Sequence, residues 1–255
     1  ETWLDEGLVD FLIPSSYSCF ILDSQMPIGW IVEAAHRQDT SVYGMLQPFY
    51  LEGRRSNTNI EHASPEKMRA AASNFWQADV DGLCTWFMDW PLEDVQRRIL
   101  TDLGDPDLTG EGNKHYFLRR RDKVATEMGY DAAIPLRIKY ADLGKRHSIP
   151  FYVSDDIEGA SERVSRVLLR LNIFDIVGTD KLTILLNGES LAGDSCLRSP
   201  SSALEPYYGQ WLEFRLKKVL PRKGDNILQI SLDQRPAGLE AAIQVEDVEV
   251  IIEYA

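Results

Sequence analysis

The stretch SPEKMRAAASNFWQADVDGLCTWFMDW, Ser64 to Trp90, predicts a helix that is followed directly by a buried strand. Ser64 is a typical N-cap residue, and Pro65 occupies the first helical position, where its missing N–H costs nothing. Spacings of three and four residues then place an apolar stripe on one face of the helix, made of Met68, Ala71, Ala72 and Phe75. The run from Asp81 to Trp90 has the apolar character of a strand. A helix that leads into such a strand indicates a β/α architecture.

The same strand and helix unit recurs around this stretch. The expected strands are Gly7–Pro14 and Ser41–Tyr50, and further helices are expected from Pro27 and over Glu93–Leu103. Strands that alternate with helices and read as nearly continuous apolar runs are buried on both faces and therefore parallel. Three such units fit either the last three units of a (β/α)8 barrel or part of an open doubly wound sheet. Because no glycine-rich phosphate loop follows the strands, we expect the partial barrel.

After Arg121 the pattern changes to short strands with β-branched residues and period-two alternation. Turn sequences such as VGTD, NGE and RKGDN separate them. The strands are expected at Ile149–Asp156, Arg163–Ile176, Asp180–Leu191, Trp211–Leu220, Asp225–Arg235 and Ile243–Tyr254. Regular short strands of this kind predict a β-sandwich. The chain is therefore expected to divide into a barrel portion, residues 1–121, and a sandwich domain, residues 122–255.

The last expected strand shows the alternation most clearly. It points Val248, Val250 and Ile252 toward the core, and it points Glu249 and Glu253 outward. Only Ile251 departs from the pattern, because it is an apolar residue on the outward side.

Composition and charge exclude several classes of function. With 255 residues, 44% of them hydrophobic, the chain is long enough for two ordinary domains. Its formal net charge of −13 disfavours nucleic-acid binding, which draws affinity from Lys and Arg, so neutral or cationic partners are expected. No apolar run approaches the roughly 20 residues of a membrane span. Because the chain begins without Met, we expect it to be a piece of a longer protein, whose localisation the sequence does not decide.

Neither a metal nor another cofactor is expected. The four histidines are scattered without the i, i+4 spacing of a zinc-binding helix. The chain also has no G-x-S-x-G elbow, which a serine hydrolase of the α/β type would need.

The chain resembles the C-terminal part of bacterial glycosyl-hydrolase-like proteins related to family-10-like (β/α)8 barrels. The resemblance is carried by EGLVDFLIPSSY (Glu6–Tyr17), Ala63–Trp90, RILTDLGDP (Arg98–Pro106) and NKHYFLRRR (Asn113–Arg121). The tail over Asp180–Leu232 is similar to the jelly-roll accessory domains that accompany such barrels. The resemblance implies a carbohydrate partner and makes the three units strands six, seven and eight. The missing N-terminal half of the barrel, or another chain, would then cover the open edges; a self-contained half-barrel is the alternative.

The resemblance also gives Glu52 a candidate role. The active site of such barrels lies at the C-terminal ends of the strands, and many of these glycosidases carry a catalytic carboxylate at the end of strand seven, which Glu52 matches. Glycoside hydrolysis needs two carboxyl groups, one as the acid and one as the nucleophile or base. In this interpretation Glu52 is the nucleophile or base, and its acid partner lies outside this chain. The alternative is a solvated loop carboxylate paired with Arg54 or Arg55.

Other candidate substrate-binding residues follow the expected strands: Tyr17, Arg54, His62, Trp86, Asp89 and Trp90. Trp86 and Trp90 offer apolar platforms for sugar rings, and Asp89 could bind hydroxyl groups or serve as an alternative catalytic carboxylate. The alternatives are core packing for the tryptophans, a loop anchor for Tyr17 and a plain surface residue for His62.

In the sandwich domain, SSALEPYYGQW (Ser201–Trp211) predicts an aromatic loop in which Tyr207, Tyr208 and Trp211 could stack on a sugar. Inward packing of these side chains would exclude that role, and such modules also serve as structural supports. The sequence therefore predicts a glycoside hydrolase-like protein that acts on or binds a polysaccharide or oligosaccharide. The alternative is a non-catalytic carbohydrate-binding or structural protein.

Overall fold

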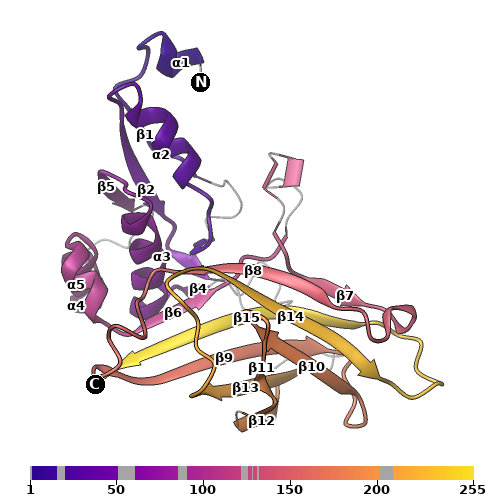
Figure 1. The fold of residues 1–255 in the computed structure, drawn as a ribbon. Helices are drawn as coiled ribbons and strands as arrows, with labels where there is room; N and C mark the ends of the chain where they lie inside the picture. The colour runs from indigo at the N-terminus through magenta and orange to yellow at the C-terminus, as the bar shows by residue number, and fades with distance from the viewer. Residues whose placement is uncertain are drawn as a thin grey trace.

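The computed structural model describes residues 2–15, 21–50, 61–85, 91–121, 126–127, 129–130, 132–193, 195–201 and 209–255. The described residues between 2 and 111 form a helix-containing part, which we call the α/β part. It stands upright on a larger part built from antiparallel sheets, the described residues between 114 and 255, which we call the β part (Figure 1).

The α/β part is built from short helices around a small sheet. Its helices are α1 (Thr2–Asp5), α2 (Gly29–His36), α3 (Pro65–Gln77), α4 (Asp94–Leu103) and α5 (Pro106–Glu111). Its strands are β1 (Phe11–Leu12), β2 (Ser41–Leu46), β3 (Phe49–Tyr50), β4 (Glu61–His62) and β5 (Gly82–Thr85). The first, second and fifth strands form a parallel sheet in the order β1-β2-β5, whereas β3 and β4 pair as an antiparallel ribbon.

The expected partial (β/α)8 barrel is wrong. Among the described residues the parallel sheet has only three short strands, and neither of its edges continues to a further strand. The other sheets are antiparallel, so strands in antiparallel sheets dominate the fold. The expected strand Ser41–Tyr50 also breaks after Leu46, and its last two residues leave the parallel sheet to pair with β4. A nearly continuous apolar run indicates that a strand is buried on both faces. It does not indicate that the sheet closes into a barrel.

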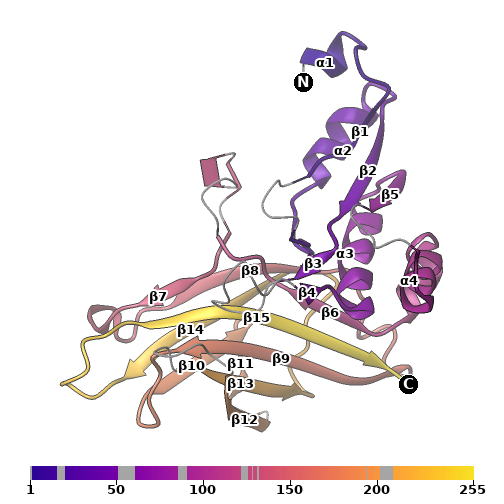
Figure 2. The same cartoon turned by 180° about the vertical axis from the view of Figure 1, so that it is seen from behind.

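Helix α3 begins where the sequence predicts. The Ser64 side chain accepts a hydrogen bond from the N–H of Lys67 at 3.4 Å, and Pro65 follows at the first position. The buried face of the helix packs on β2, where Gly44 lies so close to Phe75 that a Cβ would be 2.6 Å from its ring. Helix α4 lies beside α3 (Figure 2). This packing makes one apolar core for the α/β part, which includes Val32, Val42, Leu46, Met68, Phe75 and Leu103.

The β part consists of two antiparallel sheets. The smaller sheet, in the order β11-β10-β14-β8, contains β8 (His147–Val153), β10 (Lys181–Leu186), β11 (Glu189–Ser190) and β14 (Gly224–Gln234). The larger sheet, in the order β12-β13-β9-β15-β6, contains β6 (Lys114–Phe117), β9 (Val164–Phe174), β12 (Ser195–Pro200), β13 (Gly209–Leu216) and β15 (Ile243–Tyr254). Strand β7 (Leu136–Ile138) also pairs with β15, and the connections include two 3-10 helices, η1 (Tyr140–Asp142) and η2 (Leu191–Gly193).

The two sheets enclose a second apolar core between them. Alternate residues of β15, namely Val248, Val250 and Ile252, point into it, as the alternation in the sequence predicts. The facing sheet contributes Ile149, Leu228 and Ile230. Removing these side chains from water is the main source of stability for such a layered arrangement.

Strand β6 joins the two parts of the molecule. Tyr116 belongs to the core of the β part, whereas the next residue, Phe117, belongs to the core of the α/β part. One strand can serve both cores because successive side chains point to opposite faces of the sheet. β6 precedes the expected domain boundary at Arg121 but pairs with β15 of the larger sheet. The division into residues 1–121 and 122–255 stays a prediction.

Candidate functional site

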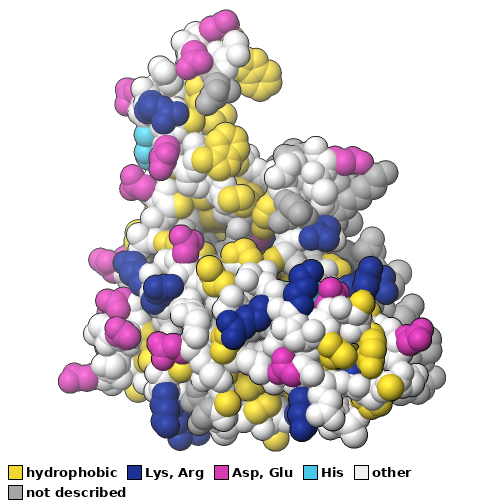
Figure 3. All heavy atoms as spheres, turned by 45° about the vertical axis from the view of Figure 1, so that its right-hand side comes forward, with side chains coloured by type: hydrophobic (Ala, Val, Ile, Leu, Met, Phe, Trp, Pro, Cys, Tyr) yellow, Lys and Arg dark blue, Asp and Glu magenta, His cyan; other side chains and the backbone are white. Residues whose placement is uncertain are grey.

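A groove of about 890 Å³ lies between the α/β part and the edge of the smaller sheet. One side is formed by residues 24–29 and by Glu33 of α2, and the opposite side by residues 150–152 of β8 and 225–227 of β14. The lining also includes Asn74 of α3 and, beyond β6, Arg119, Tyr130 and Ala132. Figure 3 shows a hollow beside the upright α/β part, with apolar side chains exposed in it. Concave surfaces with apolar walls and a few polar groups are the usual form of a ligand site.

Gln25 fixes the first wall of the groove to the free edge of β8. Its Oε1 accepts a hydrogen bond from the N–H of Tyr152 at 2.6 Å, and its Nε2 donates to the carbonyl of the same residue at 3.0 Å. The amide side chain thus takes the place of a neighbouring strand and satisfies backbone groups that an edge strand would otherwise leave unpaired. These two hydrogen bonds tie the wall to the sheet.

Asn74 holds the base of the groove. Its Nδ2 donates to the carbonyl of Ser24 at 2.6 Å, and the Ser24 hydroxyl donates to the carbonyl of Phe117 at 2.7 Å. These hydrogen bonds anchor Asn74, which is only 8% exposed. Its Oδ1 is a buried acceptor that has no hydrogen-bond partner among the described residues.

A buried ion pair lies below the groove. Oδ2 of Asp23 is 3.7 Å from Nη1 of Arg119, and each side chain is 4% exposed. Burial raises the pKa of Asp23, although Arg119 and the N–H of Gln25 both favour its charged form. The guanidinium of Arg119 also lies 5.9 Å from the ring centre of Tyr130. This pair makes the groove's buried end close to neutral.

The opposite wall combines apolar surface with a carboxylate. Tyr152 of β8 lies across from Asp225 of β14, and Pro150 lies across from Ile227, which is 45% exposed. Burial raises the pKa of the Tyr152 hydroxyl, and the charge of Asp225 raises it further, so this phenol remains neutral and can donate a hydrogen bond. The wall therefore offers a half-buried aromatic ring together with a donor and an acceptor.

Most of the residues predicted from the sequence lie outside the described part of the chain. These are Tyr17, Glu52, Arg54, Trp86, Asp89, Trp90, Tyr207 and Tyr208. Their roles stay predictions.

Two predicted site residues are described, and neither lines the groove. His62 is exposed at the end of β4, with its ring centre 5.0 Å from that of Phe49. Trp211 in β13 is only 6% exposed, and the guanidinium of Arg170 lies 4.2 Å from its ring centre. Its role in sugar binding stays a prediction, and its burial counts against it because little ring surface is open to a ligand.

Sequence reasoning missed the residues that do line the groove. Gln25, Asn74, Tyr130, Tyr152 and Asp225 come from segments far apart in the chain. Only Tyr152 carried a usable signal, since the alternation of the strand around it sets Pro150 and Tyr152 opposite the buried side chains of Ile149, Phe151 and Val153.

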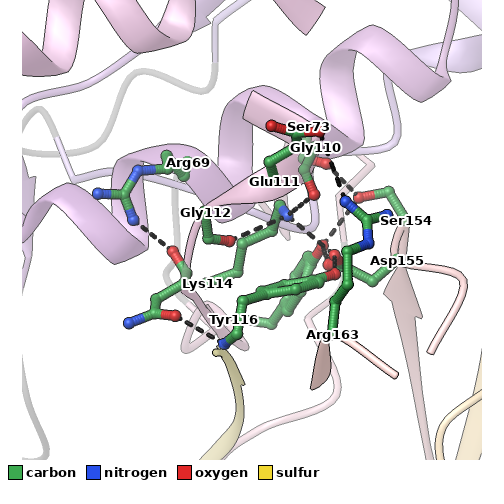
Figure 4. Close-up of polar contacts among 12 residues, drawn as sticks. Arg69, Ser73, Gly110, Glu111, Gly112, Lys114, Tyr116, Ser154, Asp155 and Arg163 are labelled. Atoms are coloured by element: carbon green, nitrogen blue, oxygen red, sulfur yellow. Dashed lines mark hydrogen bonds and ion pairs between the residues drawn. The ribbon is translucent and has the colours of Figure 1, made fainter. Parts of the chain in front are cut away.

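A second polar network lies at the end of the core of the β part (Figure 4). Nζ of Lys114 donates to Oδ1 of Asp155 at 2.8 Å and to the carbonyls of Gly110 and Gly112 at 3.0 and 3.3 Å. The hydroxyls of Tyr116 and Tyr254 also donate to Asp155. Burial lowers the pKa of Lys114, and the charge of Asp155 opposes that shift. Because Lys114 is fully buried and its donors are all used, this network is structural.

In the described part of the chain, no group of three or more His, Cys, Asp or Glu side chains could hold a metal ion. None of the helices within these residues is long and apolar enough to cross a membrane.

Comparison with known proteins does not assign a family. No family model and no curated protein matches the chain. Among the solved structures that match is one titled "Crystal structure of BuGH86wt in complex with neoagarooctaose", with a TM-score of 0.34 and 12% sequence identity. The match covers 56% of this chain and 19% of that one, so it involves about a fifth of the other chain's length. A likeness this weak carries no argument about family or function.

Proposed function

We propose that this protein binds a carbohydrate in the groove between the α/β part and the smaller sheet. The observation that carries the proposal is the wall formed by Tyr152 and Asp225, which lines the groove beside the loop of Gln25. A sugar ring has apolar C–H faces that pack on aromatic rings and hydroxyl groups that pair with carboxylates, amides and phenols. This wall provides both kinds of partner. The resemblance of the sequence to glycosyl-hydrolase-like proteins supports the same class of ligand.

A catalytic form of the proposal makes the protein a glycoside hydrolase-like enzyme with Glu52 as the nucleophile or base. That assignment is supported only by the resemblance. It was based on the position of Glu52 after the seventh strand of a (β/α)8 barrel, and that barrel is wrong. We therefore propose binding in the groove as the primary function of the protein.

The binding proposal is tested by calorimetric titration of the whole chain with a panel of neutral, acidic and amino-group-containing oligosaccharides. Tyr152→Ala should weaken binding of the best ligand about tenfold, since an aromatic contact contributes about 1 kcal/mol or more. Tyr140→Ala is the matched control, because Tyr140 is half-buried in η1 and does not line the groove. Absence of binding to the whole panel, or equal loss in both variants, would contradict the proposal.

A further inference from the structure

We propose that the groove selects glycans that carry protonated amino groups, such as chains of glucosamine. This inference rests on the proposed function and specifies its ligand. It follows from the charges that line the groove and from an exposed tryptophan on the adjoining helix.

Two carboxylates line the groove from opposite sides. Glu33 projects from α2 in the α/β part, and Asp225 lies on β14 in the smaller sheet. Both residues are exposed, and neither has an ion-pair partner among the described residues. Carboxylates that remain unpaired on the two walls of a concave surface attract a cation placed between them.

Among the described residues that line the groove, no positively charged side chain balances the carboxylates of Glu33 and Asp225. Arg119 is the positively charged residue that the described lining contains, and it is buried against Asp23. That pair sums to zero charge, so Glu33 and Asp225 give the described part of the lining a net negative charge. A uronic acid or a sulfated sugar would meet repulsion here, whereas an ammonium group would gain favourable interactions.

The chemistry of an ammonium group suits a lining that carries negative charge. An ammonium group has three donors and no acceptor, so it can pair with carboxylates without leaving an acceptor of its own unsatisfied. A plain hydroxyl group has one donor and no charge.

The adjoining helix adds an aromatic surface. Trp30 is 65% exposed and lies three residues before Glu33 on α2, so the two side chains are neighbours on the helix surface. An exposed tryptophan beside a carboxylate can hold a sugar ring by stacking and can also attract an ammonium group through its ring face. The site therefore extends from the groove onto α2.

The inference is tested with three hexasaccharides that share a β-1,4 backbone: a glucosamine hexamer, its N-acetylated form and a glucose hexamer. Calorimetric titrations of the whole chain at low salt and mildly acidic pH should give at least about fivefold tighter binding to the glucosamine hexamer, since each exposed ion pair contributes up to about 1 kcal/mol. The double variant Glu33→Gln/Asp225→Asn should remove this preference, so that the glucosamine hexamer binds no more tightly than the other two hexasaccharides.

The control variant is Glu189→Gln/Asp107→Asn, which makes the same change in net charge at exposed positions away from the groove. It should keep the preference. If the control loses as much as the groove variant, the attraction comes from the overall charge of −13 and the inference is overturned. Equal affinity for all three hexasaccharides, or binding only to other members of the panel, would overturn the inference and leave the proposed function standing. If no glycan binds to the protein, both the inference and the proposed function are rejected.

Discussion

The hydroxyl of Tyr50 donates a 2.9 Å hydrogen bond to Oε1 of Glu249, and this contact joins two residues that are 199 positions apart in the chain. Tyr50 ends β3 of the α/β part, and Glu249 lies on the outer face of β15. Oε2 of Glu249 is 2.8 Å from Nη1 of Arg170 and 3.1 Å from Nε2 of His115. A carboxylate on the outer face of the larger sheet thus anchors the α/β part.

The charge of Glu249 is maintained by its partners. Burial acts to raise the pKa of this carboxyl, but the hydrogen bond and charge of His115 and the charges of Arg170 and Lys67 outweigh it and lower the pKa. Replacing Glu249 by Gln keeps the shape and removes the charge. Arg170 would retain Glu213, 3.4 Å from its Nε, so the loss should stay below that of a fully isolated buried charge.

We therefore expect Glu249→Gln to lower the free energy of unfolding by about 2–4 kcal/mol, measured by urea denaturation. Glu253→Gln on the same strand is the matched control, because its ion pair with Arg166 is partly exposed and should contribute about 1 kcal/mol or less. Equal effects of the two substitutions would show that Glu249 is not the anchor described above.

The sequence predicted this strand well and its surroundings poorly. Alternation correctly assigned Val248, Val250 and Ile252 to the core and turned Glu249 away from it. An outward side chain is normally exposed, yet Glu249 is 2% exposed because it meets Tyr50, His115 and Arg170. Periodicity reports which face of a strand a residue occupies, and it contains no information on what a distant segment places over that face.

The same limit explains the outcome for the fold and the groove. Helix α3 was predictable because its N-cap, Ser64, and its first residue, Pro65, act locally. The prediction of a barrel was wrong for a different reason. Local signals in the sequence indicated short parallel strands, but no local signal specifies that such strands close into a barrel. The groove could not be predicted, since Gln25, Asn74 and Asp225 meet only after the α/β part has docked on the smaller sheet.

A pH dependence is expected from Asp81, which joins β2 to the start of β5. Its Oδ2 accepts hydrogen bonds from the N–H of Val42 at 2.7 Å and from Nε2 of His36 at 3.0 Å. These contacts, the Val42 N–H first, hold the pKa of Asp81 below its usual value of 3.8. A lowered pKa in the folded state means that the stabilisation is complete above the unfolded value and is lost as the pH falls through the folded value.

The difference in unfolding free energy between the wild type and Asp81→Asn should therefore be constant at neutral pH and shrink as the pH falls below about 4. Because the Asp81 side chain is 38% exposed, we expect the neutral-pH difference to remain below about 1 kcal/mol. Asp79→Asn, at a side chain that is 94% exposed, should show little change at any pH. A difference for Asp81→Asn that grows in acid would have the wrong sign for this account.

The network around Lys114 predicts a strong coupling between two buried charges. Lys114 and Asp155 have side-chain exposures of 0% and 2%, and their charged atoms are 2.8 Å apart (Figure 4). Lys114→Met removes the cation and leaves the Asp155 carboxylate with the hydroxyls of Tyr116 and Tyr254, which should cost about 3–5 kcal/mol of unfolding free energy. Lys145→Met, at a side chain that is 66% exposed, should be nearly neutral.

The double variant Lys114→Met/Asp155→Asn should be more stable than the sum of the two single losses predicts, because it leaves no isolated buried charge. The amide oxygen of the new asparagine can still accept a tyrosine hydroxyl. A double-mutant cycle by urea denaturation measures the coupling, and additive losses would mean that the two charges do not depend on one another.

The final prediction concerns Glu52 and separates catalysis from binding. The sequence resemblance predicts that Glu52→Gln abolishes any hydrolysis of glycosides, because amide and carboxylate have the same shape but an amide cannot act as the nucleophile or base. The proposed binding function assigns the affinity to Tyr152 and Asp225, so it predicts that Glu52→Gln leaves the affinity for the best ligand of the wild type unchanged. Release of reducing sugar and calorimetric affinity should be measured on the same preparations, with folding checked by circular dichroism.

Loss of hydrolysis at constant affinity would assign Glu52 to the chemistry and the groove to binding. Hydrolysis that survives the substitution would instead identify Glu52 as a loop carboxylate, and an affinity lost together with the activity would contradict the separation of the two sites.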